Sequence, residues 1–144
     1  METLIDLLKK TLADTFTMYL KTHSFHWNVE GPNFPQYHKF FGKLYEELHD
    51  AIDPIAEEIR ALDSYAPGSM GRLLELTEIK EQTIIPSSVA MAAELLNDNE
   101  IILQDLQVVF DLANELNKQG LADFIAGRID VHNKHAWMLR SITK

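Results

Sequence analysis

The stretch FPQYHKFFGKLYEELHDAIDPIAEEIRAL, residues 34–62, decides the fold class of this chain. Apolar side chains recur along it at every third or fourth position, which predicts one long amphipathic helix. Asn33 is placed as its N-cap, with Pro35 in the first turn. Pro54 lies in the interior and should kink the helix about a turn earlier, because proline removes a backbone hydrogen bond.

The same helical spacing continues through the rest of the chain, and no segment alternates as a strand does. Further helices are expected over residues 3–28, over about 72–78, from Ser88 to a break at Gly120, and over 121–139. The fold class is therefore all-α: a four-helix bundle with a short extra helix in the long second-to-third connection. At 144 residues the chain forms one domain, residues 1–144.

Apolar stripes predict which side chains form the core. The stripe of the third long helix begins at Val89. The stripe of the first helix continues into His23 and His26 and comprises Ile5, Leu8, Leu12, Phe16 and Tyr19.

The composition excludes several classes of function. The chain has no cysteine, which rules out disulfides, thiolate metal sites and thiol catalysis and fits a reducing cytoplasm. No apolar run approaches the ~18 residues that a bilayer span needs, and no signal peptide is recognised. The net charge of −9 opposes nucleic-acid binding, because an acidic surface repels the phosphate backbone. No basic patch offsets this repulsion, since Lys9-Lys10 is the only adjacent basic pair. We expect a cytoplasmic protein without a membrane partner.

Four potential metal ligands are the most informative feature: His26, His38, Asp53 and Glu57. Two imidazoles and two carboxylates suit iron or zinc better than magnesium or calcium. His38 and Asp53 share the helix over 34–62 and are fifteen residues apart. At about 1.5 Å per residue they are roughly 22 Å apart and cannot bind one ion within one chain. If the four ligands form one site, that site lies between two chains of an oligomer.

Each candidate metal ligand, taken alone, also has an interpretation that involves no metal. On a helical wheel Gly42, His49, Asp53 and Glu57 fall outside the apolar stripe, which favours a site at a subunit contact. The alternative reading of Asp53 and Glu57 is a solvated acidic face, since such residues are usually exposed. His26, taken alone, is a hydrogen-bonded core histidine.

A di-iron site inside the bundle is not expected. It requires two Glu-x-x-His motifs on separate helices plus two further glutamates. The chain has one such motif, Glu46-Glu47-Leu48-His49, and none in the third or fourth long helix. His132 and His135 are interpreted as structural because no nearby carboxylate completes a site, and His23 is interpreted as a packing residue.

Three motifs together resemble the Dps family, the mini-ferritins named for DNA-binding proteins from starved cells. They are His26-Trp27-Asn28-Val29-x-Gly31-x-x-Phe34-x-x-x-His38, then Asp53-x-Ile55-Ala56-Glu57, and finally His135-Ala136-Trp137-Met138-Leu139-Arg140. The resemblance covers essentially the whole chain, and the first two motifs at this separation are highly specific.

The resemblance implies a ferritin-like four-helix bundle with a short helix in the long connection. It also implies a hollow homo-dodecamer with a di-iron ferroxidase centre at each two-fold interface. His26 and His38 would come from one subunit and Asp53 and Glu57 from its partner, with Trp27 beside the centre as an electron-transfer residue. The implied enzyme oxidises Fe(II) with hydrogen peroxide, or more slowly with dioxygen, and stores a ferric mineral core, which protects against oxidative damage. Zinc is a candidate competitor for the same ligands, because it normally binds them more tightly. Whether it outcompetes iron here is left open by the sequence.

This chain departs from the family pattern at two positions of the site. Many relatives carry an aspartate four residues after the second histidine, where this chain has Gly42. We hypothesise that His49, which lies on the same side of the helix one turn before Asp53, substitutes as a ligand. Pro54 follows the aspartate ligand where an ordinary helix former is expected, and a kink there would reposition Asp53.

Two rival functions follow from the resemblance. The first is a DNA-compacting shell, but the chain shows no Lys/Arg-rich tail and a dodecamer would carry about −108, twelve times the chain's charge. We therefore expect no DNA binding at ~150 mM salt. The second is a storage shell whose ferroxidase activity is impaired by Gly42. Acidic candidates for the mineral surface are Glu46, Glu47 and Asp50, and the alternative reading is that they are solvated surface acids. Asp123 and Asp130 are candidates for an iron-uptake pore, although acidic residues are common on a terminal helix.

Overall fold

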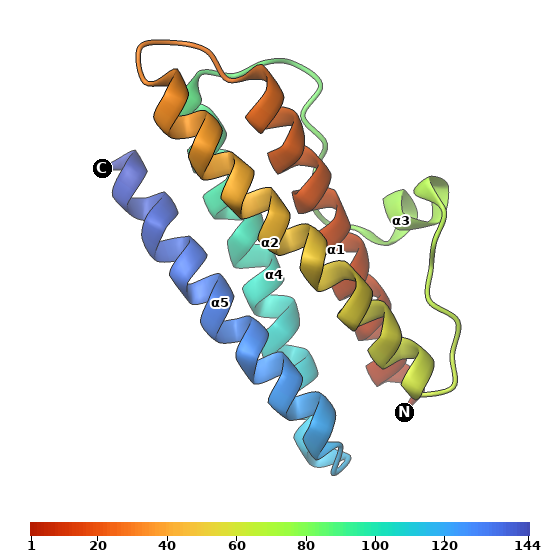
Figure 1. The fold of residues 1–144 in the computed structure, drawn as a ribbon. Coiled ribbons are helices and arrows are strands. Elements are labelled where there is room, and N and C mark those ends of the chain that lie inside the picture. Colours follow the sequence, from red (N-terminus) through yellow and green to blue (C-terminus); the bar gives the residue numbers. More distant parts are fainter.

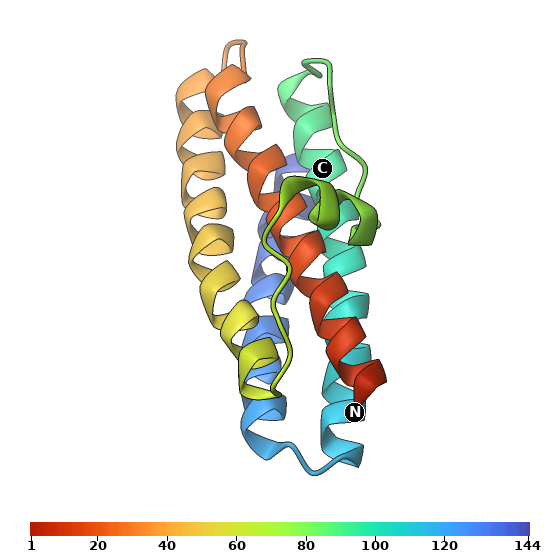
Figure 2. The same cartoon turned by 90° about the vertical axis from the view of Figure 1, so that its right-hand side faces the viewer.

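The computed structural model describes all residues 1–144 and contains five helices and no strand. The helices are α1 (Glu2–Asn28), α2 (Phe34–Ala61), α3 (Met70–Leu76), α4 (Ser88–Glu115) and α5 (Gln119–Thr143). The four long helices pack side by side as a bundle, and α3 lies outside it against α1 (Figures 1 and 2). None of the helices combines the length and the hydrophobicity that crossing a membrane requires. The predicted all-α four-helix bundle, with a short extra helix in the long connection, is confirmed.

Short turns join α1 to α2 and α4 to α5, so each pair is antiparallel. The connection between α2 and α4 instead runs the length of the bundle, which makes these two helices parallel (Figure 2). Its centre is anchored to Asp14 of α1, whose Oδ1 accepts hydrogen bonds from the Thr77 hydroxyl and the Glu78 amide, both at 2.7 Å. The Lys10 ammonium bridges Asp14 to Asp105 of α4 at 2.9 and 2.6 Å. This buried ionic cluster ties the connection to two helices.

Burial and the hydrogen bond with Asp14 raise the pKa of Asp105 to about 8. Burial also opposes ionisation of Asp14, but hydrogen bonds from Asp105, Thr77 and Lys10 outweigh it and hold the pKa of Asp14 below its ordinary value. At neutral pH the two carboxyl groups therefore hold one proton between them.

Helix ends differ in part from the sequence-based prediction. Ser87 caps α4, which begins at Ser88 as predicted, and its Oγ accepts from the Ala90 amide at 3.2 Å. Asn33 occupies the N-cap position of α2 but makes no side-chain cap bond. The predicted break at Gly120 is wrong, because α5 already begins at Gln119. The chain turns instead at Asn117, whose φ of 57° lies in the left-handed region that asparagine tolerates.

The prediction of the core face of α1 is also partly wrong. Tyr19 and His26 are only half-buried, as are Ile5 and Phe16. Leu8 and Leu12 are buried as predicted. The rest of the face that packs into the bundle consists of Leu4, Met18 and Phe25 together with buried Thr11, Thr15 and Thr22. A threonine can be buried in a helix when its hydroxyl donates to the carbonyl one turn back, as Thr22 does to Met18 at 2.7 Å. Val89, placed in the core by its spacing, is 51% exposed.

Pro54 does not end α2, which continues to Ala61. The proline ring removes the hydrogen bond that the carbonyl of Asp50 would otherwise accept. Asp50 is exposed, so water can satisfy that carbonyl. The helix therefore carries His38, His49, Asp53 and Glu57 on one continuous element.

Candidate metal centre

His26 and His38 meet where the end of α1 lies beside the beginning of α2. Their rings stack with centroids 3.8 Å apart and planes inclined by 15°. His26 Nδ1 lies 2.6 Å from the carbonyl oxygen of His38, and His38 Nδ1 lies 2.7 Å from the carbonyl oxygen of His26. A carbonyl only accepts, so each Nδ1 must carry the proton. Nε2 is then the nitrogen with which each ring can bind a metal, since histidine binds metals as the neutral imidazole through its unprotonated nitrogen.

The turn between α1 and α2 makes this exchange possible. Gly31 adopts a φ of +119°, a conformation that side chains other than glycine's hydrogen rarely permit. Val29 is buried and donates to the Phe25 carbonyl at 3.0 Å, and Phe34 donates to the Gly31 carbonyl at 3.0 Å. These bonds reverse the chain within five residues, so the last turn of α1 faces the first turns of α2.

Gly42 faces the same histidine pair from one turn further along α2. A Cβ atom at this position would lie 3.1 Å from both Cε1 and Nδ1 of His26, closer than ordinary contact. The His26 ring therefore lies against the backbone of α2. Gly42 therefore does more than leave out a ligand. Because glycine has no side chain, it leaves room for the His26 ring against α2.

Asp53 and Glu57 are exposed on α2 and do not reach the histidine pair. No group of three or more histidine, aspartate or glutamate side chains within the chain is placed to hold a metal ion. The structure thus brings together two of the four predicted ligands. The side chain of His49 is 63% exposed, with its ring 5.0 Å from that of Tyr19.

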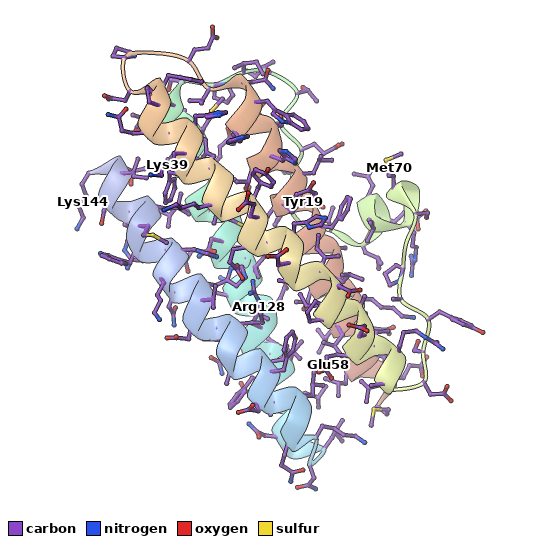
Figure 3. The ribbon with its side chains drawn as sticks, in the orientation of Figure 1. Tyr19, Lys39, Glu58, Met70, Arg128 and Lys144 are labelled. Atoms are coloured by element: carbon purple, nitrogen blue, oxygen red, sulfur yellow. The ribbon has the colours of Figure 1, made fainter.

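A group of aromatic and histidine rings adjoins the pair between α1 and α2, with Tyr19 on the α1 side (Figure 3). His23 stacks face to face on Tyr45, with centroids 3.8 Å apart and planes inclined by 8°. His23 also lies 4.1 Å from Trp27, and its Nδ1 is 3.0 Å from the Tyr19 hydroxyl. Burial, followed by the nearby imidazoles of His26 and His49, lowers the pKa of His23. His23 packs as predicted, whereas Tyr19 and Tyr45 were not identified as site residues.

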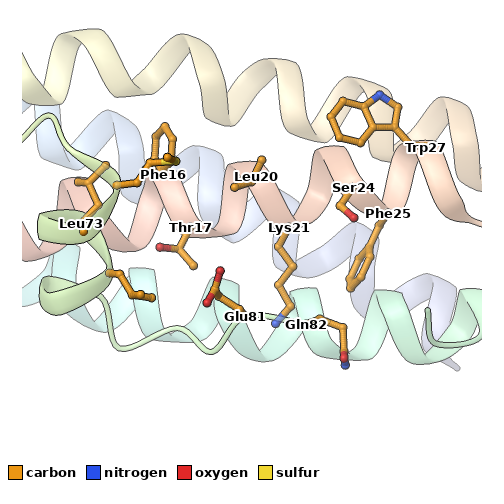
Figure 4. A pocket seen from close by; sticks show the side chains of 13 residues that line it. Phe16, Thr17, Leu20, Lys21, Ser24, Phe25, Trp27, Leu73, Glu81 and Gln82 are labelled. Atoms are coloured by element: carbon orange, nitrogen blue, oxygen red, sulfur yellow. The ribbon is translucent and has the colours of Figure 1, made fainter. Parts of the chain in front are cut away.

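Trp27 is 59% exposed and extends beyond the ring group. It lies at one end of a pocket of about 460 Å³ between α1, α3 and the connection that follows (Figure 4). Neither His26 nor His38 lines this pocket.

A second polar cluster lies inside the bundle around Arg128 of α5, which extends toward α2 (Figure 3). His135 Nε2 contacts Glu47 Oε1 at 2.8 Å, so a carboxylate does reach this histidine, contrary to the sequence argument. Arg128 binds the same carboxylate and lies 2.9 Å from His132 Nε2. His132 Nδ1 in turn contacts Asn99 at 2.7 Å. The guanidinium occupies the position of a cation, so the structural interpretation of His132 and His135 stands.

The same contacts determine the charge of Glu47. Burial alone would raise its pKa, but hydrogen bonds from His135 and Arg128 outweigh burial and lower the pKa to about 2. Burial also lowers the pKa of His132 well below its ordinary value. Glu47 was a candidate for the mineral surface. Its carboxylate is instead paired with Arg128 and His135.

Comparisons with known proteins agree with this architecture. A family profile described as a ferritin-like domain matches residues 5–144. The chain is 34% identical over 137 residues to DNA protection during starvation protein 2 of Bacillus anthracis, covering 95% of this chain and 94% of that protein. An uncharacterized low temperature-induced protein of Nostoc is 40% identical over 139 residues, covering 95% of this chain and 78% of that protein.

Solved structures give the same result. A Dps protein from Bacillus brevis has a TM-score of 0.95 at 32% identity, covering 99% of this chain and 96% of that chain. A Dps protein from Vibrio cholerae, described as a member of a broad superfamily of ferritin-like diiron-carboxylate proteins, has a TM-score of 0.96 at 28% identity, covering 99% and 90%. This chain therefore belongs to the Dps family of the ferritin-like superfamily.

Proposed function

We propose that the protein is a ferroxidase and iron-storage mini-ferritin. The observation that carries the proposal is the reciprocal bonding of His26 and His38, which uses Nδ1 of each ring and leaves Nε2 of each ring as the nitrogen available to a metal ion. A binding preference for ferrous iron fits imidazole and carboxylate ligands, and carboxylates favour the harder Fe(III) product. Iron is the substrate here and, once oxidised, the stored cargo.

The proposed centre forms between two copies of the chain. His26 and His38 come from one subunit, and Asp53 and Glu57 come from its partner. This arrangement is supported by the exposure of both carboxylates and by the roughly 22 Å that separates positions 38 and 53 along one helix. We further propose that twelve copies assemble into a hollow shell that holds the ferric mineral.

The proposed reaction reduces one hydrogen peroxide molecule with two Fe(II) ions. Two electrons from iron and two protons from solvent convert peroxide to two water molecules, so no hydroxyl radical is released. Dioxygen is a slower oxidant. The role of the protein is to hold both ions beside one oxidant molecule, which is catalysis by proximity.

His49 is proposed as an additional ligand for the second iron ion, since Gly42 supplies none. Its side chain is exposed and lies on α2 one turn before Asp53. Replacing His49 with alanine should lower the number of Fe(II) ions bound per subunit. Unchanged stoichiometry and oxidation rate would exclude this role.

The test of the main proposal is anaerobic loading with Fe(II), followed by a hydrogen peroxide pulse and a record of ferric absorbance. We expect rapid oxidation that saturates at about two Fe(II) per peroxide, the stoichiometry of a two-metal site. Glu57→Gln should slow it, while Glu100→Gln, which changes an exposed glutamate on α4, should not. Oxidation no faster than that of free Fe(II) in the same buffer would refute the proposal. Zn(II) added before iron should inhibit.

A relative that is 34% identical to this chain carries DNA protection in its name, which raises DNA binding as a second candidate function. For this chain the net charge of −9 argues against direct DNA binding. We expect no mobility shift of duplex DNA at about 150 mM salt, where screening weakens any local basic patch. A shift at that salt would favour a DNA-compacting shell instead.

A further inference from the structure

Four rings form a continuous row between α1 and α2 that ends at the proposed iron ligands. Tyr19 lies 6.1 Å from Tyr45, and Tyr45 lies 5.2 Å from His26, measured between ring centroids. His23 lies beside both tyrosines, stacked on Tyr45 at 3.8 Å and 5.6 Å from Tyr19. Each ring is thus adjacent to the next, from Tyr19 between α1 and α2 to His26, the proposed iron ligand.

Tyr19 differs from the other oxidisable rings in having a base. Its hydroxyl lies 3.0 Å from His23 Nδ1. In the tautomer of neutral His23 that carries its proton on Nε2, this nitrogen accepts the phenolic hydrogen. A phenol that loses an electron becomes a very strong acid, so its oxidation near neutral pH is feasible only when the proton leaves in the same step. Neither the Tyr45 hydroxyl nor the Trp27 indole has a hydrogen-bonded base within the chain. The geometry therefore selects Tyr19 as the electron donor.

Two electrons are needed to reduce peroxide to water, and a single Fe(II) supplies only one. The chain offers two imidazole nitrogens at the centre, and Gly42, which faces them, adds no ligand. A centre that holds one Fe(II) when peroxide arrives would therefore release a hydroxyl radical unless another donor is near.

We propose that Tyr19 supplies this second electron, as a proton-coupled donor whose proton passes to His23. The inference rests on the proposed ferroxidase function. One Fe(II), the Tyr19 phenol, neutral His23, one hydrogen peroxide and two protons from solvent give Fe(III), a neutral tyrosyl radical, protonated His23 and two waters. The O–O bond of peroxide and the O–H bond of Tyr19 break. Iron and tyrosine each lose one electron, and peroxide gains two.

The test uses the assembled, iron-free protein loaded anaerobically with one Fe(II) per subunit, pulsed with peroxide and frozen for electron paramagnetic resonance. We expect a tyrosyl radical in the unchanged protein and its loss in Tyr19→Phe, which removes only the hydroxyl. Tyr45→Phe is the matched control, a second half-buried tyrosine of the same row, and should retain the signal. His23→Phe keeps a ring on Tyr45 but removes the base, and should also abolish the signal.

A spin trap for hydroxyl radical gives the second measurement. Its adduct should increase in Tyr19→Phe relative to the unchanged protein and to Tyr45→Phe. Ferric absorbance recorded on the same samples separates the two proposals. Ferric iron formed rapidly without a tyrosyl radical, or a radical that survives in Tyr19→Phe, would overturn the role of Tyr19 alone. Oxidation no faster than in buffer would overturn the ferroxidase function and this inference with it.

Discussion

Replacing Gly42 with alanine tests whether this glycine exists to admit the His26 ring. The new Cβ would lie 3.1 Å from Cε1 and Nδ1 of His26, so the ring must move by a few tenths of an ångström. Its freedom to move is small, because Nδ1 is bonded to the His38 carbonyl at 2.6 Å and the His38 ring is stacked on it at 3.8 Å. The substitution should therefore disturb one histidine without removing any ligand atom.

Two effects on stability nearly cancel. Alanine in place of glycine inside a helix stabilises by about 1 kcal/mol. Weakening the hydrogen bond of His26 costs about 0.5–1.5 kcal/mol. Metal binding has no such compensation, because loss of the contact that orients a histidine ligand typically lowers affinity by about 10–100-fold. We expect an almost unchanged melting temperature together with a clear loss of Fe(II) affinity.

Gly127→Ala in α5 is the matched control, because a Cβ there meets no atom within 4 Å. It should gain about 1 kcal/mol and bind Fe(II) as before. Both variants are compared with the unchanged protein by anaerobic calorimetric titration with Fe(II) and by thermal unfolding at one fixed protein concentration, since assembly makes melting concentration-dependent. If Gly42→Ala gains as much stability as the control and keeps its Fe(II) affinity, the steric argument is wrong.

Three further predictions concern stability, each measured by urea unfolding. Arg128→Met should destabilise by about 3–5 kcal/mol, because it leaves the Glu47 carboxylate without its cation. In the unchanged protein the free energy of unfolding should fall as pH drops from 4.5 toward 2, since the pKa of Glu47 is about 2 when folded, and Glu47→Gln should flatten that limb. Asp105 acts oppositely. The folded chain retains its proton up to about pH 8 and the unfolded chain releases it near 3.8, so stability should fall as pH rises between these values, and Asp105→Asn should remove most of the slope. If the pH dependence of the unfolding free energy is the same in either variant as in the unchanged protein, its attribution to that carboxyl group is refuted.

The helix count and the long connection could be predicted because the apolar period of each long helix is uninterrupted. Two local errors have physical causes. Gly120 looked like a helix breaker, but an exposed glycine in the first turn of α5 is tolerated, and Asn117 makes the turn instead. The core face of α1 was displaced because an apolar stripe leaves out threonines, and Thr11 and Thr22 are buried there with their hydroxyls donating to carbonyls one turn back.

The candidate site could be predicted only as a set of residue types. Spacing along α2 correctly placed His38 and Asp53 too far apart to meet within a chain. It could not show that His26 and His38 exchange backbone hydrogen bonds, since this depends on how the turn at Gly31 positions two helices. The Tyr19–His23 bond has a sequence signal, an i,i+4 spacing on one helix, but the same spacing is common among residues that only pack.

The exchange between His26 and His38 also bears on the order in which an iron site would assemble. Each Nδ1 is already held by the other residue's carbonyl oxygen, so the two imidazoles are fixed before any ion arrives. Immobilising a free side chain at a binding site costs about 0.5–1.5 kcal/mol, and for these two that cost falls on folding rather than on binding. The carboxylates of Asp53 and Glu57 are exposed and unrestrained by comparison. We therefore expect the histidines to be a rigid docking point that captures Fe(II) first, with the acidic side chains closing on the ion afterwards.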